Sequence, residues 1–483
     1  MKYTKRALLV FMLLAFMVGY YYQDPEANGN SRIGLIFAIV QEGRLTIDSY
    51  YNNEGTKTID RAFFNGHYYT DKAIGTSILG ALFYAPMYWL MKLTGHELGL
   101  LRIKYFLTLL VVGLPSAFAG SLVYVLCETI SGSRLRAYLA TLAVTLGTMC
   151  LPFSAIFFGH QFAAALLFCS FFLIFQLKLK LDLRQKRGYL FLIGFLLGSA
   201  FLTEYTTPVI ILPLGLYYLY ILRERGSFRW ILSTILPPAL GGSIPVGILM
   251  IYNTLCFGNP FTIGYEHLAN QFQAAMSQGF LGISWPQLDV LFYLTFHPAY
   301  GLFWQSPVLL MALVGFYFLW RDQRYRLEGI IVLIAFFSYL LINSGYYMWW
   351  GGASFGPRHL IPMLLFLSIP LVLVPRRLFP LVIILGLISI AQMFIPLAGK
   401  MLVPDSSLTG ADHFGFFEYS PIYSFSLQQL MKGYFAYNLG EKLLGLKKWM
   451  ILLPNILAIL VTTGIFVAIE KRLPRKDLPK AGT

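Results

Sequence analysis

Long apolar segments separated by short polar stretches run along almost the whole chain. Thirteen of them approach the length of about 20 residues that a helix needs to span a bilayer. This pattern predicts an all-α polytopic membrane protein. The segments lie near residues 7–22, 74–92, 104–127, 137–157, 161–177, 189–203, 206–222, 230–253, 303–320, 327–342, 359–374, 379–397 and 448–469.

Basic residues at both ends of the chain limit how many segments cross. Lys and Arg collect in cytoplasmic loops. Lys2, Lys5 and Arg6 precede the first segment, and Lys471 follows the last. Both termini are therefore expected in the cytoplasm, which requires an even number of crossings. We expect a bundle of about 12 transmembrane helices, within a range of roughly 11 to 13, in which one segment between residues 74 and 222 does not cross.

This topology places four loops on the face away from the cytoplasm. They are residues 23–73, 254–302, 343–358 and 398–447. The loops divide the chain into a transmembrane module at 1–253, an extracytoplasmic loop at 254–302, and a C-terminal transmembrane module at 303–483 that carries the last two loops.

The first outer loop, residues 23–73, is expected to be folded. It contains seven of the 22 acidic residues of the chain. Residues 31–42 within it carry apolar side chains at helical spacing, which suits a helix lying along the membrane surface. We therefore expect this loop to contain amphipathic juxtamembrane helices.

Composition and charge agree with a membrane protein. Of the 483 residues, 57% are hydrophobic and 12% are charged, and the mean hydropathy is +0.65. A soluble domain carries roughly 25% charged residues. The net charge of +15 could suggest a nucleic-acid partner, but most of the excess lies in predicted cytoplasmic loops. No nucleic-acid-binding motif is found, so we expect no nucleic-acid partner.

The first group of candidate site residues follows the first apolar segment. Asp24 and Glu26 flank Pro25, and Arg32 comes shortly after them. A carboxylate at the membrane boundary can act as a general base on an incoming hydroxyl or amine. Two such acids could also hold a hard divalent ion. Alternatively, they only mark the water interface at the end of a helix.

The second group lies where the same loop returns to the membrane. It comprises His67, Tyr69, Asp71 and Lys72. A lysine at this depth can meet an anionic group such as a lipid-linked phosphate. The alternative is a lysine that snorkels at a helix end. Asp71 would be its ion-pair partner or a second acid of the site.

The third group combines glycine, tryptophan and arginine in the loop that ends at residue 358. Trp349 and Trp350 offer aromatic faces for a sugar or an acyl chain, and Arg358 can bind phosphate through two hydrogen bonds. An aromatic belt with one interfacial arginine is the alternative. Tyr265 lies in a weaker motif that fits a lining segment or a turn. Glu204, between two apolar segments, is a functional candidate because charges inside membranes are rare. A turn between two short helices would explain it equally well.

These features resemble the GT-C superfamily of integral-membrane glycosyltransferases. The shared pattern is a retained first helix, an outer loop that opens with an acidic motif and closes with a lysine, and a long series of helices. The branch it most resembles contains the protein O-mannosyltransferases and the lipid A aminoarabinose transferases. The sequence departs from the first because Pro25 separates its two acids, and from the second because Ala73 and Ile74 follow Lys72 where those enzymes have Pro-Pro.

The resemblance implies a hexosyl- or pentosyltransferase in the bacterial inner membrane, with 1–253 as its catalytic module. The enzyme would move a sugar from a polyprenyl-phosphate donor to a glycan, lipid or protein acceptor on the extracytoplasmic face. Asp24 and Glu26 would be the catalytic acids, and Lys72 would contact the donor phosphate. We assign a second phosphate contact to Arg358. The remaining candidates would line the substrates: Arg32, His67, Tyr69, Asp71, Tyr265, Trp349 and Trp350.

Two other functions stay open at this point. A polymerase or ligase would take a lipid-linked oligosaccharide on a diphosphate carrier, and it should carry several arginines in its outer loops. A transporter or flippase of lipid-linked sugars should carry polar residues along many helices and an inverted repeat. Neither pattern is evident in the sequence. A metal-independent reaction is expected, with a divalent cation left open.

Overall fold

The computed structural model describes residues 4–180, 182, 186–223, 228–270, 272–404 and 420–471. These residues are mostly helical, so the predicted all-α class is confirmed. Two short antiparallel sheets pair β1 with β4 and β2 with β3. The strands are β1 (Tyr21–Tyr22), β2 (Ala62–Phe64), β3 (His67–Tyr69) and β4 (Tyr437–Asn438).

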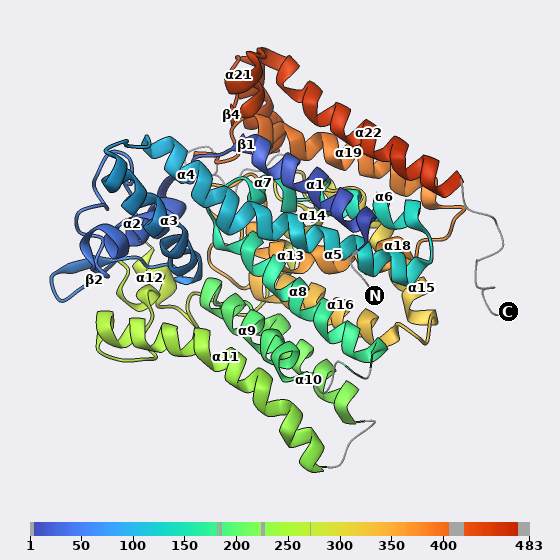
Figure 1. The fold of residues 1–483 in the computed structure, drawn as a ribbon, viewed down its shortest axis with the longest axis horizontal. Helices are drawn as coiled ribbons and strands as arrows, with labels where there is room; N and C mark the ends of the chain where they lie inside the picture. The colour runs from blue at the N-terminus through green and yellow to red at the C-terminus, as the bar shows by residue number, and fades with distance from the viewer. Residues whose placement is uncertain are drawn as a thin grey trace.

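The longer helices form the bundle seen in Figure 1. They are α1 (Lys5–Tyr20), α2 (Glu26–Phe37), α3 (Gly75–Thr94), α4 (Leu100–Thr108), α5 (Leu114–Ser131), α6 (Arg134–Thr145), α8 (Gly159–Leu179), α9 (Arg187–Thr203), α10 (Pro208–Arg223), α11 (Phe228–Phe257), α15 (Leu309–Arg321), α16 (Arg326–Ser344), α19 (Phe379–Ala398) and α22 (Leu453–Lys471). The short helices are α7 (Cys150–Ser154), α12 (Gln273–Met276), α13 (Leu288–Thr295), α14 (Leu302–Gln305), α17 (Ile361–Leu364), α18 (Ser368–Val372), α20 (Gln428–Met431) and α21 (Leu439–Leu444).

Among the described residues, six helices are long and apolar enough to cross a membrane, which supports an integral membrane protein. Four shorter apolar helices accompany them. The figure of about 12 crossings stays a prediction. The six candidate spans are Leu100–Ser131, Gly159–Leu179, Ser233–Phe257, Arg326–Ser344, Phe379–Ala398 and Lys448–Lys471.

Residues 23–99 form a compact lobe at one end of the bundle, which we call the N-terminal lobe. It contains α2, the π-helix Ala38–Glu42, the hairpin β2–β3 and α3. Figure 1 shows it at the left, while α1 begins and α22 ends at the opposite end of the bundle. Both basic ends of the described chain therefore lie away from the lobe, as the predicted topology requires.

Helix α3 packs against other parts of the N-terminal lobe near both of its ends. At its first turn, Thr76 accepts a hydrogen bond from Arg32 on α2. Six residues after its last residue, the side chain of Leu100 lies against Gly55. Although α3 has 20 residues, it is not among the six candidate spans. The predicted non-crossing segment between residues 74 and 222 stays unassigned.

Helix α2 corrects the expectation for residues 31–42. The predicted helix exists, but ten of its 12 residues are buried, so it does not lie along the membrane surface. It is enclosed because α3 packs on one side, while Ile47 and Tyr50 cover it near Gly34. Within the N-terminal lobe, α3 has exposed apolar residues, with Leu82 and Leu93 68% and 83% exposed.

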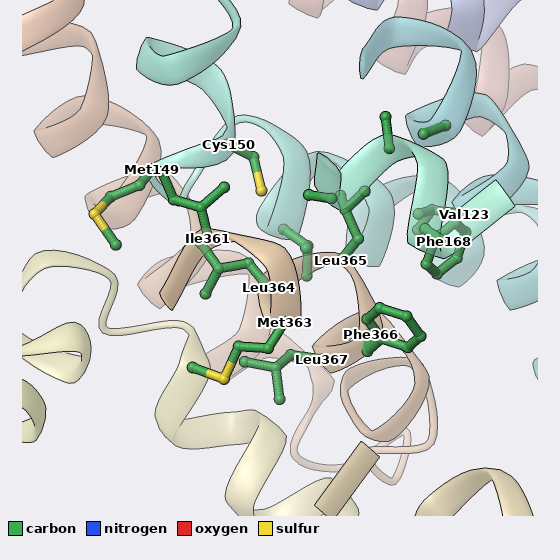
Figure 2. Packing of buried hydrophobic residues seen from close by; sticks show 14 of the residues in the cluster. Val123, Met149, Cys150, Phe168, Ile361, Met363, Leu364, Leu365, Phe366 and Leu367 are labelled. Atoms are coloured by element: carbon green, nitrogen blue, oxygen red, sulfur yellow. The ribbon is translucent and has the colours of Figure 1, made fainter. Parts of the chain in front are cut away.

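The centre of the bundle is a continuous apolar core. Figure 2 shows Ile361, Leu365 and Phe366 of the segment Ile361–Leu367 on the side of Met149, Cys150, Val123 and Phe168, while Met363 and Leu367 point the other way. All of these residues are buried. A segment that is apolar on every face belongs inside the protein. This segment runs through the core and continues into α18.

Helices α9 and α11 approach each other through glycine, which gives a test of the packing. A Cβ atom on Gly194 would lie 1.8 Å from the carbonyl oxygen of Pro238. We expect Gly194→Ala to cost roughly 1–3 kcal/mol of folding free energy through overpacking. Thermal unfolding in detergent measures this. Gly247→Ala on α11, with nothing near its Cβ position, is the control, and equal melting temperatures for both variants would contradict the prediction.

Candidate active site

Lys72 is enclosed by acids and a tyrosine at the base of the N-terminal lobe. It lies between β3 and α3, and its side chain is 11% exposed. Its Nζ is 3.1 Å from Oδ2 of Asp60 and 3.1 Å from Oδ2 of Asp71. The ammonium also lies 5.5 Å from the centre of the Tyr265 ring. Lys72 is therefore a buried, paired cation and not a snorkelling lysine.

Asp60 and Asp71 both act on the pKa of Lys72, and the pKa of Asp71 is itself shifted. Burial alone would lower the pKa of Lys72, but Asp60 and Asp71 outweigh it and raise that pKa well above its usual value. Burial raises the pKa of Asp71 to about 6, Asp60 adds to the rise, and Lys72 opposes it. Oδ1 of Asp71 is buried and has no hydrogen-bond partner among the described residues. Lys72 therefore stays charged while Asp71 changes protonation near neutral pH.

Arg358 is a cation that no carboxylate of the described residues contacts directly, although Asp60 and Glu204 act on its charge from farther away. Within the described part of the chain its side chain forms no ion pair or hydrogen bond, and its Nε is buried. The guanidinium lies 5.0 Å from the centre of the Phe158 ring. Gly351 has a φ of 90°, and a Cβ there would be 3.1 Å from Cγ of Arg358. Glycine thus leaves room for Arg358, whose charge calls for an anionic ligand.

Lys72 and Arg358 both lie near Tyr346. Burial raises the pKa of the Tyr346 phenol, and Lys72 and Arg358 both lie close enough to oppose that rise. Tyr265 also raises the pKa of Tyr346, and the Lys72 ammonium lies over the Tyr265 ring. The two predicted phosphate contacts, far apart in sequence, therefore have Tyr346 as a common neighbour, and their joint role stays a prediction.

Asp24 and Glu26 form a separate charged cluster at the start of α2. Oδ2 of Asp24 is 3.6 Å from Nζ of Lys104, and Oε1 of Glu26 is 3.3 Å from Nζ of Lys400. Both acids are about half exposed, 56% and 47%. Glu26 has a left-handed backbone, with φ 46°, which is strained for a residue with a side chain. Both acids are accessible to a substrate, but their ion-pair partners are neither Lys72 nor Arg358.

The acids do not form a metal site. Among the residues that the structure describes, no three His, Cys, Asp or Glu side chains lie close enough together to hold an ion. Asp24 and Glu26 each face a lysine, which would repel a divalent cation. The possible divalent cation stays a prediction.

Arg32 does not line a substrate cavity as predicted. Its side chain is 2% exposed and forms an ion pair with Glu204, at 3.0 Å between Nη2 and Oε1. His160 lies on the same carboxylate, with Nδ1 3.4 Å from Oε1. The prediction was wrong because acceptors from distant parts of the chain surround the guanidinium.

Among the other residues predicted to line the substrates, some are buried in the core and others are exposed. Tyr69 is 7% exposed and packs on Phe257, 5.3 Å between ring centres, so it is a core residue. His67 is 56% exposed and lies 2.7 Å from Asp48 in the hairpin. Trp349 stacks on Tyr293, 5.4 Å between centres, and Trp350 meets Trp349 edge-on.

Several charged residues of this region were not predicted. Asp60 belongs to an acidic loop in which sequence gives no reason to single it out. Lys104 is buried in an apolar helix, and a charge in such a helix is a signal that could have been used. The ring of His359 lies 5.2 Å from that of His160, and its Nε2 is buried without a partner within the described residues.

An apolar cavity of about 410 Å³ lies between α8, α9, α10 and α11. Its lining includes Leu197, Phe201 and Ile211. From Phe201 a row of rings leads to Lys72: Phe201 is 6.0 Å from Tyr205, and Tyr205 is 6.0 Å from Tyr265. The cavity is therefore linked to the cationic site by aromatic contacts.

The fold is that of a polytopic helical membrane protein, and it is similar to a fold of the kind that the sequence resemblance predicts. No protein-family model matches the sequence, and no curated protein is similar to it. The chain is similar to the crystal structure of ArnT, a lipid A aminoarabinose transferase from Cupriavidus metallidurans, bound to undecaprenyl phosphate. The TM-score is 0.52 and the identity 15%, over 96% of this chain and 76% of that one.

A second similar structure is the oligosaccharyltransferase AglB from Archaeoglobus fulgidus in complex with an inhibitory peptide and a dolichol-phosphate. Its TM-score is 0.42 and its identity 11%, over 97% of this chain and 56% of that one. At such identities the likeness to ArnT concerns the fold, which is thereby confirmed.

Proposed function

We propose that this protein is a membrane glycosyltransferase that takes a sugar from a polyprenyl-phosphate donor. The observation that carries the proposal is Arg358, which no carboxylate of the described residues contacts directly and which, like Lys72, lies close enough to Tyr346 to act on it. Two cations suit a phosphate head group. The apolar cavity beyond Phe201 suits the polyprenyl tail. The shared fold with ArnT, which was crystallised with undecaprenyl phosphate, supports this assignment.

The reaction is a direct displacement with inversion at the anomeric carbon. The hydroxyl or amine of the acceptor attacks this carbon while the bond from the carbon to the phosphate oxygen breaks. Asp24 accepts the proton of the acceptor. The electron pair stays on the polyprenyl phosphate, where Lys72 and Arg358 stabilise the charge that develops. A monophosphate leaving group bound by two cations needs no metal.

The proposed site opens on the extracytoplasmic face of the bacterial inner membrane. The N-terminal lobe carries Asp24 and Lys72, and it lies at the end of the bundle away from the first residue of α1 and the last of α22. Those basic ends belong in the cytoplasm by the positive-inside rule. Lipid-linked donors would reach Lys72 from the membrane, and a glycan, lipid or protein acceptor would arrive from outside.

Release of free carrier tests the proposed function. Purified protein in nanodiscs is mixed with undecaprenyl-phosphate sugars and candidate acceptors, and free undecaprenyl phosphate is measured by mass spectrometry. We expect acceptor-dependent release. Binding of the donor without release for any acceptor would favour the transporter, and release only from diphosphate-linked donors would favour the ligase or polymerase.

Asp71 gives the site a defined pH dependence. Because its pKa is raised to about 6, Asp71 is protonated below that pH and adds a negative charge beside Lys72 above it. That charge competes with the donor phosphate. We expect the ratio of Kd for undecaprenyl phosphate, wild type over Asp71→Asn, to rise as pH increases from 5 to 7.5. Taking the ratio cancels the titration of the phosphate itself, and a constant ratio would contradict the prediction.

A further inference from the structure

A buried ion pair joins the N-terminal lobe to the bundle directly behind Lys72. Nη2 of Arg32 on α2 lies 3.0 Å from Oε1 of Glu204, the residue directly after α9. His160, near the start of α8, lies 3.4 Å from the same oxygen. Gly159 makes room for the pair, because a Cβ there would lie 2.2 Å from Oε1 of Glu204. Side chains from α2 and α8 thus meet at one carboxylate oxygen of Glu204, just after α9.

Arg32 also holds the chain immediately after Lys72. Its Nη1 donates to the carbonyl of Ala73 at 2.7 Å and to Oγ1 of Thr76 at 3.2 Å. The carbonyl of Arg32 itself accepts from Oγ of Ser77 at 3.0 Å. The segment that follows Lys72 is therefore tied to α2 at three points.

The chain before Lys72 is tied to the same helix. Oγ of Ser31 and Oγ1 of Thr70 share a hydrogen bond of 2.7 Å, and Oγ1 of Thr70 accepts from the backbone N–H of Lys72 at 3.2 Å. Two successive residues of α2, Ser31 and Arg32, therefore hold the chain on both sides of Lys72. Glu204 in turn fixes the position of Arg32.

We propose that Glu204 and Arg32 are positioning residues that place the Lys72 ammonium for the donor phosphate. The inference rests on the proposed function of Lys72. A buried ion pair is a costly way to stabilise a fold, since apolar residues of the same volume do as well or better. An ion pair with directed hydrogen bonds instead fixes one geometry, and the geometry fixed here is that of residues 70–77.

The test is the Kd for undecaprenyl phosphate measured on purified protein. We expect Glu204→Gln, which keeps the shape but removes the charge, to weaken binding roughly tenfold or more. The matched control is Glu328→Gln. Glu328 is also a buried, paired carboxylate, 2.8 Å from Lys178 and bonded to Tyr217, but it does not touch the site. Both variants should lose thermal stability, and only Glu204→Gln should lose affinity.

A double-mutant cycle shows whether Glu204 acts through Lys72. In a Lys72→Ala background, Glu204→Gln should cause little further loss of affinity. Additive losses, or equal losses of affinity for Glu204→Gln and Glu328→Gln, would overturn the inference. If Glu204→Gln does not fold, Ser31→Ala takes its place, because it removes only one neutral hydrogen bond. The expected loss of affinity is then smaller, and the same outcomes decide the inference.

The outcomes separate this inference from the proposed function. Wild-type protein that fails to bind undecaprenyl phosphate, or a Lys72→Ala variant that binds it as well as wild type, would overturn the proposed function. Loss of binding in Lys72→Ala together with unchanged binding in Glu204→Gln would overturn only the positioning role.

Discussion

Replacing Lys72 with alanine is expected to lower the transfer rate roughly 100- to 1,000-fold, because one of two groups that stabilise the leaving phosphate is lost. Lys72→Arg should retain part of the activity, since it keeps the charge in a larger side chain. The measurement is release of free carrier from an undecaprenyl-phosphate sugar. The binding of undecaprenyl phosphate itself should weaken in parallel.

The control for Lys72→Ala is Lys92→Ala. Lys92 is exposed in the last turn of α3 and forms no ion pair with a described residue, so its loss should not change the rate. Because Lys72→Ala leaves Asp60 and Asp71 without their cation, each preparation is checked by thermal unfolding. A folded Lys72→Ala variant with the wild-type rate would remove Lys72 from the mechanism.

Replacing Asp24 with asparagine should lower the rate by roughly 100- to 10,000-fold through loss of the general base. The affinity for undecaprenyl phosphate should stay unchanged, because Asp24 pairs with Lys104 and not with the phosphate-binding cations. Rates and Kd values for the same preparations separate the two effects. This split between rate and binding distinguishes Asp24 from Lys72.

Two acids of the same lobe serve as comparisons for Asp24→Asn. Glu54→Gln changes an exposed residue away from the cluster and should leave the rate intact. Glu26→Gln tests the second catalytic candidate. A larger loss in Glu26→Gln than in Asp24→Asn would transfer the role of base to Glu26, and equal wild-type rates in both would exclude this cluster from catalysis.

The sequence predicts the apolar helices well because their signal is local. It predicts α2 poorly for the opposite reason. Asn30, Ser31 and Arg32 look like a polar face exposed to water, but each finds a partner far along the chain, such as Lys57, Thr70 or Ala73. Periodicity detects apolar positions and cannot tell which polar residues will be satisfied inside the protein.

The candidate site shows the same limit. Lys72 and Arg358 could be chosen from sequence because the positive-inside rule does not explain cations in outer loops. Asp60 could not, since nothing in the sequence places it closer to Lys72 than the other acids of the loop. The pairing of Arg32 with Glu204 joins residues 172 positions apart and reverses the role expected for Arg32. Distance in sequence hides the groups that hold the site in place.

The separation of Arg32 and Glu204 also sets an order of assembly during synthesis. Glu204 is translated 172 residues after Arg32, which takes roughly 9 to 34 s at the usual rate of synthesis. Until α9 has entered the membrane, the lobe holds an arginine that lacks its carboxylate. The lobe therefore reaches its final geometry only after the first half of the bundle is in place, and a ribosome that stalls before α9 would leave it incomplete.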